Sequence, residues 1–356
     1  MLHPRQVLLG AQAASGLLPV CDHYSGVEAR MLKSLALQRE MTEEFGRCVF
    51  DVTLDCEDGA PAGAEDLHAN MVAGLARQAW DAHKNIALEN PAKAARIAAR
   101  VHPVDHPAFQ HDIQTLVEGA GDMWCHLMIP KAESVADIDL AVKAIDQAMA
   151  QCKQAGKRTG PIPLHALIES ANAVRNAYAI AAHPRIQSLS FGMMDFLSSH
   201  GGAIPASAMD VASCDGRLGQ FEHPLITRAK LEISSACHAA GKVPAHSVIT
   251  EFADMGKMAT AALRASREFG FTRMWSIHPS QIRPILEALA PQSEEIEEAA
   301  AIVSAAEKAQ WAPINAAGRL HDRASYRYYW QVLERANQTG RALPLAVQKY
   351  FSPQTQ

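Results

Sequence analysis

Two acidic residues, Glu169 and Asp195, follow short apolar segments in a way that would bring their carboxylates together. Glu169 closes the segment Pro163–Glu169, and Asp195 comes shortly after Ser188–Gly192, with a helical pattern between them. A strand, a helix and a second strand predict parallel neighbours whose carboxyl ends share one edge of a sheet, where α/β enzymes place their chemistry. Two oxygen ligands with room for water and substrate suit Mg²⁺ better than zinc. The sequence therefore predicts a magnesium site built on these two residues.

Eight short apolar runs that could form strands recur along the chain. They are Leu17–Cys21, Val49–Glu57, Ala98–His102, His126–Pro130, Leu164–Glu169, Ser188–Gly192, Val243–Val248 and Arg273–His278. Ala-rich amphipathic stretches separate them, and the helical patterns include His68–Trp80, Val135–Gln151, Ala171–Ala182, Leu225–Ala240 and Met255–Phe269. Eight alternating strand and helix units predict an α/β protein of the (β/α)₈ barrel type, also called a TIM barrel.

The barrel is expected to occupy residues 1–290 as the catalytic domain, and residues 291–356 a separate C-terminal segment. Helical patterns at Ser293–Gln310 and Ala324–Asn337 predict that this segment is helical, with a glycine-containing turn between the two helices. The Gly- and Ser-rich stretch Leu197–Glu222 follows a strand end. Its length is unusual for a strand-to-helix connection and predicts an active-site loop.

Composition excludes several classes of protein. The chain of 356 residues is 48% hydrophobic and 20% charged with a formal net charge of −5, as expected for a soluble enzyme. The absence of a basic stripe argues against a nucleic-acid partner. No apolar run approaches the ~20 residues that span a membrane, so no membrane partner is expected. Seven scattered cysteines without a Cys-x-x-Cys pair predict reduced thiols in a cytoplasmic protein.

Seven short motifs occur in order along nearly the whole chain. They are Leu54–Gly59 (LDCEDG), Arg100–His102 (RVH), Ile129–Lys131 (IPK), Ile168–Ser170 (IES), Phe191–Asp195 (FGMMD), Ile277–Ile282 (IHPSQI) and Gly318–Asp322 (GRLHD). Together they resemble the citrate lyase β-subunit and malyl-CoA lyase group, which also contains the HpcH/HpaI-type aldolases. The resemblance implies a carbon–carbon lyase that uses Mg²⁺, with Mn²⁺ as an alternative. Such enzymes cleave 3-hydroxyacyl-CoA thioesters of the malyl, citramalyl or citryl type into an acyl-CoA and a 2-oxo acid.

The resemblance also implies roles for residues around the predicted metal site. Arg100 is the expected clamp for the 2-oxo acid, because its planar fork binds carboxylates and a developing oxyanion; a surface arginine is the alternative. Glu57 and Asp58 either orient metal-bound waters, as catalytic residues, or form a structural ion pair with Arg100 or Lys131. The substrate contacts implied in the FGMMD motif are Gly192, Met193 and Asp195.

Asp322 lies outside the predicted barrel, in the C-terminal segment. The resemblance implies that this segment is a lid over a site, often the neighbouring subunit's, in a homo-oligomer such as a trimer or hexamer. Asp322 would then exchange the proton at the acyl methyl carbon, and the alternative is a helix N-cap. Lys131 could form a Schiff base, but nearby carboxylates favour a protonated lysine in a salt bridge. His278 is expected to be a hydrogen-bonded structural residue rather than a base.

Two departures from the family pattern concern the substrate. The family's first strand reads L-F-V-P-G, whereas the segment here, Leu17–Gly26, ends in CDHYSG and places Asp22, His23 and Tyr24 within possible reach of a ligand. His102 replaces an Asn of the RVN motif, which is expected to alter acid selectivity. Two other functions therefore stay open: a class II aldolase acting on free hydroxy-oxo acids without CoA, and a non-catalytic acyl-CoA-binding subunit.

Overall fold

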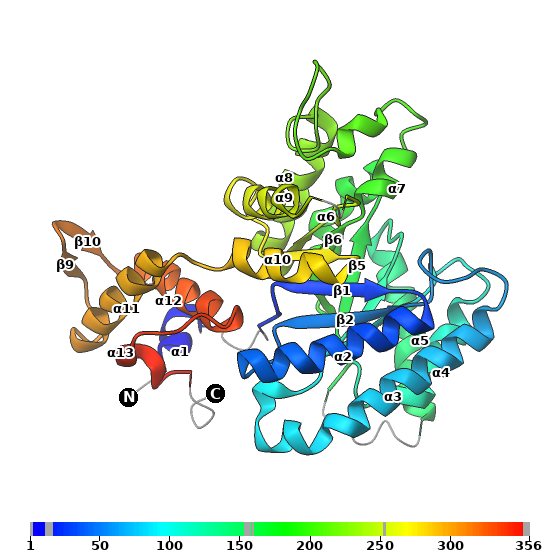
Figure 1. Ribbon diagram of the computed structural model, residues 1–356, viewed down its shortest axis with the longest axis horizontal. Helices are drawn as coiled ribbons and strands as arrows, with labels where there is room; N and C mark the ends of the chain where they lie inside the picture. The colour runs from blue at the N-terminus through cyan, green and yellow to red at the C-terminus, as the bar shows by residue number, and fades with distance from the viewer. Residues whose placement is uncertain (1–2, 11–16, 153–157, 159, 252–253, 352–356) are drawn as a thin grey trace.

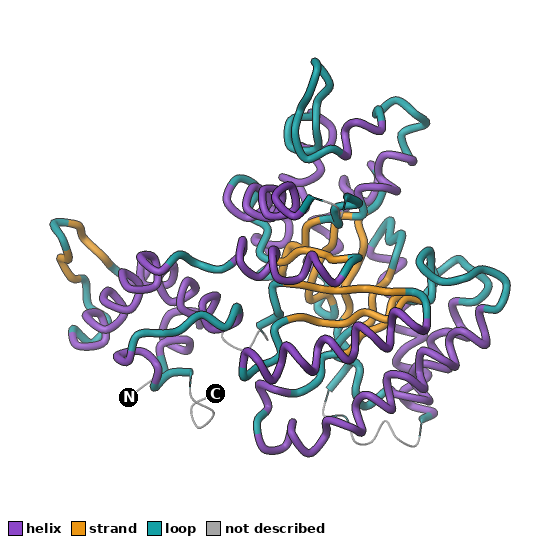
Figure 2. The backbone as a smooth tube through the Cα atoms, in the orientation of Figure 1, coloured by secondary structure: helices purple, strands orange, loops and turns teal. Residues whose placement is uncertain are grey.

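The main body of the protein is a closed barrel of eight parallel strands arranged in sequence order (Figures 1 and 2). The computed structural model describes residues 3–10, 17–152, 158, 160–251 and 254–351. The strands are β1 (Cys21–Ser25), β2 (Phe50–Asp55), β3 (Ile97–Arg100), β4 (Leu127–Ile129), β5 (Leu164–Ile168), β6 (Ile186–Phe191), β7 (Val243–His246) and β8 (Arg273–Ser276). Pairing of β1 with both β2 and β8 closes the barrel, so the predicted fold class is confirmed.

Helices cover the outside of the barrel and alternate with the strands. They are α2 (Glu28–Phe45), α3 (Glu65–Glu89), α4 (Phe109–Ala120), α5 (Val135–Gln151), α6 (Ala171–Ala182), α7 (Met193–Ser198), α8 (Pro224–Ala240), α9 (Met255–Arg267) and α10 (Ile282–Leu289). Short 3₁₀ turns are η2 (Pro91–Lys93), η4 (Ala206–Met209) and η5 (Pro279–Gln281). In α5, a capping box at Ser134 and Asp137 starts the helix, and apolar residues at helical spacing, such as Ile138 and Ile145, are buried.

The sequence patterns located most elements but misplaced the first strand. The predicted strand Leu17–Cys21 is wrong, because β1 begins where that run ends and carries Asp22 and His23. Both side chains are buried with polar partners, which an apolar pattern does not register. The helix α2 was not predicted, since its buried face includes Ser34 and Gln38. The Gln38 amide donates to two backbone carbonyls, and this pairing makes a polar residue tolerable in the core.

A second, smaller core lies outside the barrel and is called the C-terminal unit here. It contains α11 (Ser293–Lys308), β9 (Ile314–Ala316), β10 (Arg319–His321), α12 (Arg323–Gln338), α13 (Leu345–Gln348) and also α1 (Pro4–Leu9). Its buried residues include Leu8, Ile296, Val303, Trp330 and Leu333. The two antiparallel strands form a hairpin where the sequence predicted a glycine-containing turn, and Gly318 at its tip has a φ of 75°.

The C-terminal unit joins the barrel at the amino-terminal ends of the strands (Figure 1). The Gln338 side chain donates to the carbonyl of Leu18, just before β1, at 3.0 Å. A Cβ on Gly340 would lie 2.4 Å from the ring of Phe45, at the end of α2. The unit therefore projects away from the carboxyl ends of the strands, where the predicted site lies.

Two further findings bear on the class of protein. All seven cysteines are free thiols. Within the described part of the chain, no helix combines the length and the apolar character that a membrane crossing needs.

Candidate active site at the carboxyl end of the barrel

Glu169 follows β5 directly, and its carboxylate is held at the mouth of the barrel. Its Oε2 accepts a hydrogen bond from the backbone N–H of Lys131 at 2.7 Å. Lys131 has a φ of 51°, an uncommon conformation for a residue with a side chain. On the other side, a Cβ at Gly192 would lie 2.5 Å from Oε1 of Glu169, so only glycine leaves room for this carboxylate. The end of β4 and the end of β6 together fix its position.

Asp195 lies in the first turn of α7, close enough for its charge to act on Glu169. Burial and, next, the negative charge of Asp195 raise the pKa of the Glu169 carboxyl to about 8. Two carboxylates that repel each other in a buried setting are a ready site for a cation, which would remove the repulsion. Their oxygen donors fit a hard divalent ion such as Mg²⁺.

Arg100, the last residue of β3, is held rigidly by two carboxylates. Its Nε and Nη2 donate to Asp55 at 2.6 Å each, and its Nη1 lies 3.0 Å from Oε2 of Glu57. Asp55 is the register partner of Arg100 on β2 and is completely buried. Burial lowers the pKa of Arg100, but the charge of Asp55, the hydrogen bonds to it and the charge of Glu57 together outweigh burial and hold the pKa above its ordinary value. A guanidinium has five N–H groups, and the two hydrogen bonds to Asp55 leave others that could bind a substrate.

Asp55 is a site residue that sequence reasoning missed. Asp55 lies inside the LDCEDG motif, but the sequence around it does not show which residue its side chain binds. The partner Arg100 is 45 residues away and becomes a neighbour only through the pairing of β2 with β3. Asp55 also accepts from the backbone N–H of Glu57 and of Gly59, so it shapes the loop that carries both acidic candidates.

Glu57 and Asp58 both form ion pairs with Lys131. The ammonium group donates to Glu57 and, at 3.0 Å, to Asp58. Burial lowers the pKa of Lys131, but the hydrogen bonds to Glu57 and Asp58 outweigh this effect and raise it above the ordinary value. The amine is therefore charged at neutral pH, which disfavours a Schiff base. Glu57 is buried and bridges Lys131 and Arg100, whereas Asp58 is exposed.

The side chains of the remaining candidates, Met193, His102 and His278, are each held by contacts within the protein. The side chain of Met193 is packed in the main hydrophobic core, so a contact between this residue and a substrate would use its backbone. His102 is bonded to Asp112 of α4 through both its backbone N–H and its Nδ1, the latter at 2.7 Å. His278 caps the short turn η5 and accepts from the backbone N–H of Ser280, in agreement with the structural role expected for it.

Asp322 is not brought together with Glu169 and Asp195 of the same chain. It caps α12, accepting from the backbone N–H of Ala324 at 2.9 Å and of Ser325 at 3.4 Å. The 16 residues of α12 span roughly 24 Å, and their far end touches the amino-terminal end of the barrel. The start of α12, which Asp322 caps, therefore lies on the distal side of the C-terminal unit, and this unit lies beyond the end of the barrel opposite to the mouth (Figure 1).

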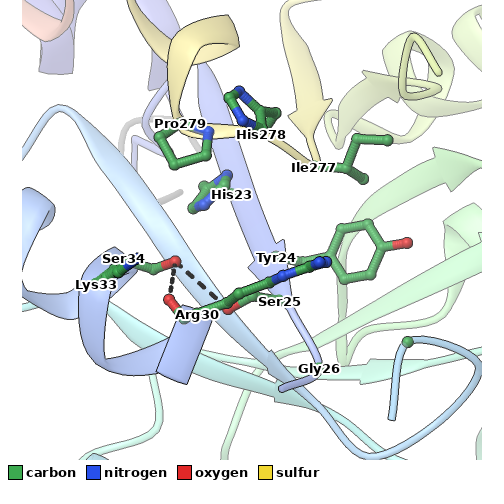
Figure 3. A pocket seen from close by; sticks show the side chains of 11 residues that line it. His23, Tyr24, Ser25, Gly26, Arg30, Lys33, Ser34, Ile277, His278 and Pro279 are labelled. Atoms are coloured by element: carbon green, nitrogen blue, oxygen red, sulfur yellow. Dashed lines mark hydrogen bonds between the residues drawn. The ribbon is translucent and has the colours of Figure 1, made fainter. Parts of the chain in front are cut away.

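A cavity of about 610 Å³ opens beside the mouth, between β1, β8 and α2 (Figure 3). Two basic residues of α2, Arg30 and Lys33, contribute to its wall. The side of the cavity nearer the barrel is formed by Tyr24 and Gly59, which adjoin the cluster of Arg100. A ligand in this cavity could thus extend from basic groups on α2 to the ion-paired groups of the mouth.

A second group of metal-ligand residues lies deeper in the barrel and has a structural explanation. Asp22, His126 and His165 offer donor atoms within 4.8 Å of one another. However, Nη2 of Arg273 lies 2.7 Å from Asp22 and 2.6 Å from Asp51, so a cation already balances these carboxylates. The rings of the two histidines are stacked, with centroids 3.5 Å apart and planes 13° from parallel, so their in-plane lone pairs do not converge on one point. We interpret this cluster as a buried ion-pair layer.

Comparison with known proteins agrees with this geometry. The sequence model of the family described as HpcH/HpaI aldolase/citrate lyase matches residues 31–279. A relative named L-malyl-CoA/beta-methylmalyl-CoA lyase, from Rhodobacter capsulatus, is 30% identical over 80% of this chain and 87% of its own length.

Solved structures resemble the whole chain. A structure described as a citrate lyase from Burkholderia xenovorans covers 99% of both chains with 44% identity and a TM-score of 0.75. The CitE protein of Mycobacterium tuberculosis, solved with magnesium, acetoacetate and coenzyme A, covers 90% of this chain and 98% of that one. At 20% identity and a TM-score of 0.61, this second likeness concerns the fold alone. Both the family match and the malyl-CoA lyase relative extend over most of the chain, which therefore belongs to the HpcH/HpaI aldolase/citrate lyase family.

Proposed function

We propose that this protein is a Mg²⁺-dependent carbon–carbon lyase that cleaves a 3-hydroxyacyl-CoA of the malyl, citramalyl or citryl type. The products are an acyl-CoA and a 2-oxo acid, and the reaction is reversible. The observation that carries the proposal is the buried carboxylate of Glu169. The backbone N–H of Lys131 and the absence of a side chain at Gly192 fix its position, and the nearby negative charge of Asp195 makes the pair a suitable site for a cation. The malyl-CoA lyase relative supports the substrate class.

The residues at the mouth divide the chemistry between them. Glu169 and Asp195 would hold the metal ion, which when bound supplies Lewis-acid polarisation of the 2-oxo acid oxygens. The N–H groups of Arg100 that do not donate to Asp55 would bind the same carboxylate and stabilise negative charge on it. Asp55 and Glu57 keep the guanidinium in place and charged. Lys131 binds both Glu57 and Asp58 and holds their carboxylates in place, where they could accept hydrogen bonds from waters at the site.

The cavity beside the mouth supports a CoA thioester over a free hydroxy acid. Arg30 and Lys33 give it a positive wall that suits phosphate groups, which a free hydroxy-oxo acid lacks. A CoA ester could place its phosphates there while its acid end reaches Glu169 and Arg100. The same arrangement would leave the thioester between the two ends, beside Tyr24 and Gly59.

Asp322 would complete the site from another subunit. In the cleavage direction it would donate a proton to the enolate carbon, and in condensation it would abstract that proton. The C-terminal unit that carries Asp322 lies at the end of the barrel opposite to the mouth of the same chain. We therefore propose a homo-oligomer, such as a trimer or hexamer, in which each C-terminal unit reaches the mouth of a neighbouring barrel.

The decisive test is release of a 2-oxo acid from malyl-, methylmalyl- and citramalyl-CoA, with Mg²⁺ and with EDTA. We expect Mg²⁺-dependent release of glyoxylate or pyruvate, and loss of at least 100-fold in Glu169→Gln, which keeps the volume of the side chain but removes a charged ligand. Thermal denaturation with and without Mg²⁺ gives a second readout, because the variant should lose the stabilisation by metal. Release only from free hydroxy-oxo acids would assign a class II aldolase, and activity that survives EDTA would overturn the metal mechanism.

A further inference from the structure

Tyr24, on β1, is placed between the basic cavity and the ion-paired cluster of the mouth. Its ring packs against Trp275 with centroids 5.2 Å apart, and the guanidinium of Arg100 lies 5.1 Å from the ring centroid. The indole of Trp275 is fixed in turn by a hydrogen bond from its Nε1 to Ser190 at 3.0 Å. Two rigid neighbours from β8 and β3 therefore hold the phenol in one orientation.

The hydroxyl of Tyr24 has no hydrogen-bond partner among the described residues, and it is not sealed from the cavity. In Figure 3 its ring extends away from Ser34 and Lys33, which stand on the other side of the view. Burial raises the pKa of the phenol above its ordinary value, so the group is protonated at neutral pH and can donate. A fixed donor without a protein partner, in the wall of a cavity, is suited to a ligand oxygen.

Glycines on the two adjacent loops allow the chain to pack closely beside this side chain. A Cβ at Gly59 would lie 2.3 Å from Oδ2 of Asp55 and 3.4 Å from the ring of Tyr24. A Cβ at Gly26 would lie 1.9 Å from the carbonyl oxygen of Gly59, so the ends of β1 and β2 approach each other closely. Gly26 therefore leaves room for the backbone of Gly59, and Gly59 leaves room for the carboxylate of Asp55, so the wall beside the phenol ring is tightly packed.

We propose that the hydroxyl of Tyr24 donates a hydrogen bond to the thioester carbonyl oxygen of the substrate. This proposal rests on the function proposed above, because it needs an acid end at Glu169 and Arg100 and a phosphate end at Arg30 and Lys33. The thioester is the part of such a ligand that lies between its two ends, and Tyr24 lines the cavity between those two groups of residues.

The hydrogen bond would matter most during cleavage. When the carbon–carbon bond breaks, the 3-hydroxyl of the substrate loses its proton to a water at the mouth and becomes the carbonyl group of the 2-oxo acid. The electron pair of the broken bond stays on the acyl fragment, and the thioester carbonyl oxygen becomes the enolate oxygen. A preorganised donor at this oxygen stabilises the transition state more than the ground state. Tyr24 transfers no proton in this step and acts only as a donor.

The test compares Tyr24→Phe with the wild-type enzyme. This change removes only the hydroxyl, and we expect kcat to fall by about 10- to 100-fold, because one donor to a developing oxyanion is lost. Binding of acetyl-CoA, measured by calorimetry, should weaken by about 3- to 10-fold, whereas CoA, which has no thioester carbonyl, should bind as before. The melting temperature should not change, since the hydroxyl bonds to no described residue.

Controls separate the outcomes. Tyr178→Phe removes a hydroxyl from a half-exposed tyrosine of α6 and should leave both kcat and binding unchanged. Wild-type kcat in Tyr24→Phe, or equal weakening of acetyl-CoA and CoA, would overturn the role of Tyr24 while leaving the lyase proposal intact. A lowered melting temperature with proportionate loss of activity would assign the hydroxyl a structural role instead. Inactivity of the wild-type enzyme on every thioester would reject the proposed function itself.

Discussion

Arg100, a candidate for binding the substrate carboxylate, is held in position by Asp55, a buried residue that the sequence did not mark as part of the site. Two of its five N–H groups donate to Asp55, its Nη1 forms an ion pair with Glu57, and its guanidinium lies over the ring of Tyr24. An arginine with free side-chain torsions would lose entropy on binding a carboxylate, whereas this one is already ordered. At the scale of single residues, then, Asp55 determines what Arg100 can do.

Replacement of Asp55 should damage both stability and activity. Asp55→Asn leaves the buried guanidinium with one carboxylate in place of two, and we expect a loss of about 3 kcal/mol in the free energy of unfolding. The kcat/KM should fall by about 10- to 100-fold because Arg100 is no longer held. Urea denaturation and steady-state kinetics measure the two effects. As a control, Asp146→Asn breaks an exposed pair with Arg185 and should cost less than about 1 kcal/mol. Equal losses in both variants would contradict this account.

At the scale of elements, the site is made by strand ends and by the residues that turn the chain after them. Glu169 follows β5, and Gly192 follows β6 where the chain enters α7. Gly192 has no unusual backbone conformation, with a φ of −89°. Its importance is therefore spatial, because a methyl group would occupy the volume of the Glu169 carboxylate.

A pair of glycine variants tests this distinction. Gly192→Ala should displace the carboxylate and weaken Mg²⁺ binding at least tenfold, without unfolding the protein. Gly74→Ala changes an exposed glycine inside α3 that has no heavy atom within 4 Å of the added Cβ. It should stabilise the protein by about 0.5–1 kcal/mol, since glycine is unfavourable within a helix. Metal titration by calorimetry and thermal denaturation give the readouts. Undiminished metal binding in Gly192→Ala would remove Glu169 from the predicted site.

The strands also carry buried histidines that make the fold sensitive to acid. Burial lowers the pKa of both His165 on β5 and His246 on β7 well below 6.5. Below about pH 6.5 the unfolded chain therefore binds protons that the folded protein does not, so stability falls as the pH falls. The expected loss is about 1.4 kcal/mol per pH unit for each histidine.

Urea denaturation between pH 7 and pH 5 measures this dependence. His246→Asn keeps a donor for the carbonyl of Ser247, which Nδ1 contacts at 3.0 Å, but does not titrate. The free energy of unfolding of this variant should fall less steeply with decreasing pH than that of the wild-type protein. The two slopes should differ by about 1.4 kcal/mol per pH unit. His111→Asn, at an exposed position of α4, should keep the wild-type slope. A slope unchanged in His246→Asn would show that this histidine becomes protonated within the folded barrel.

At the scale of the whole molecule, the C-terminal unit and the mouth of the barrel lie on opposite sides of the barrel. The contacts at Gln338 and Gly340 join the unit to the amino-terminal end of the barrel, with Asp322 on the far side. A site that needs Asp322 as well as Glu169 must therefore combine two chains.

Mixing two inactive variants tests this arrangement. Glu169→Gln and Asp322→Ala should each lose at least 100-fold in activity. After subunit exchange, some sites pair a wild-type Glu169 with a wild-type Asp322 from another chain. In an equal mixture with random exchange, about half of the sites contain a wild-type Glu169 and about half receive a wild-type Asp322. About a quarter of the sites therefore contain both, and about a quarter of the wild-type activity should return. No recovery, despite exchange verified by native mass spectrometry, would place both residues' action within one chain.

The sequence by itself determined the barrel and predicted which end of it carries the candidate site. Alternating apolar strands and amphipathic helices are local patterns, and each is readable within a short window because burial imposes its own periodicity. Glu169 and Asp195 were readable for the same reason: parallel strands put their carboxyl ends at one edge. Strand β1 and helix α2 escaped this reasoning, since their buried faces carry polar residues whose partners are distant in the chain.

Only the tertiary structure decided which of these groups meet. The pairing of Asp55 with Arg100 depends on strand register, and that of Lys131 with Glu57 joins residues 74 positions apart. The position of Tyr24 between the cavity and Arg100 requires the closure of β1 against β8. Asp322 was readable as a motif, but its separation from the mouth follows from the way α12 packs. Periodicity reports which residues are buried, whereas contacts between distant segments depend on register, closure and packing, which no local pattern contains.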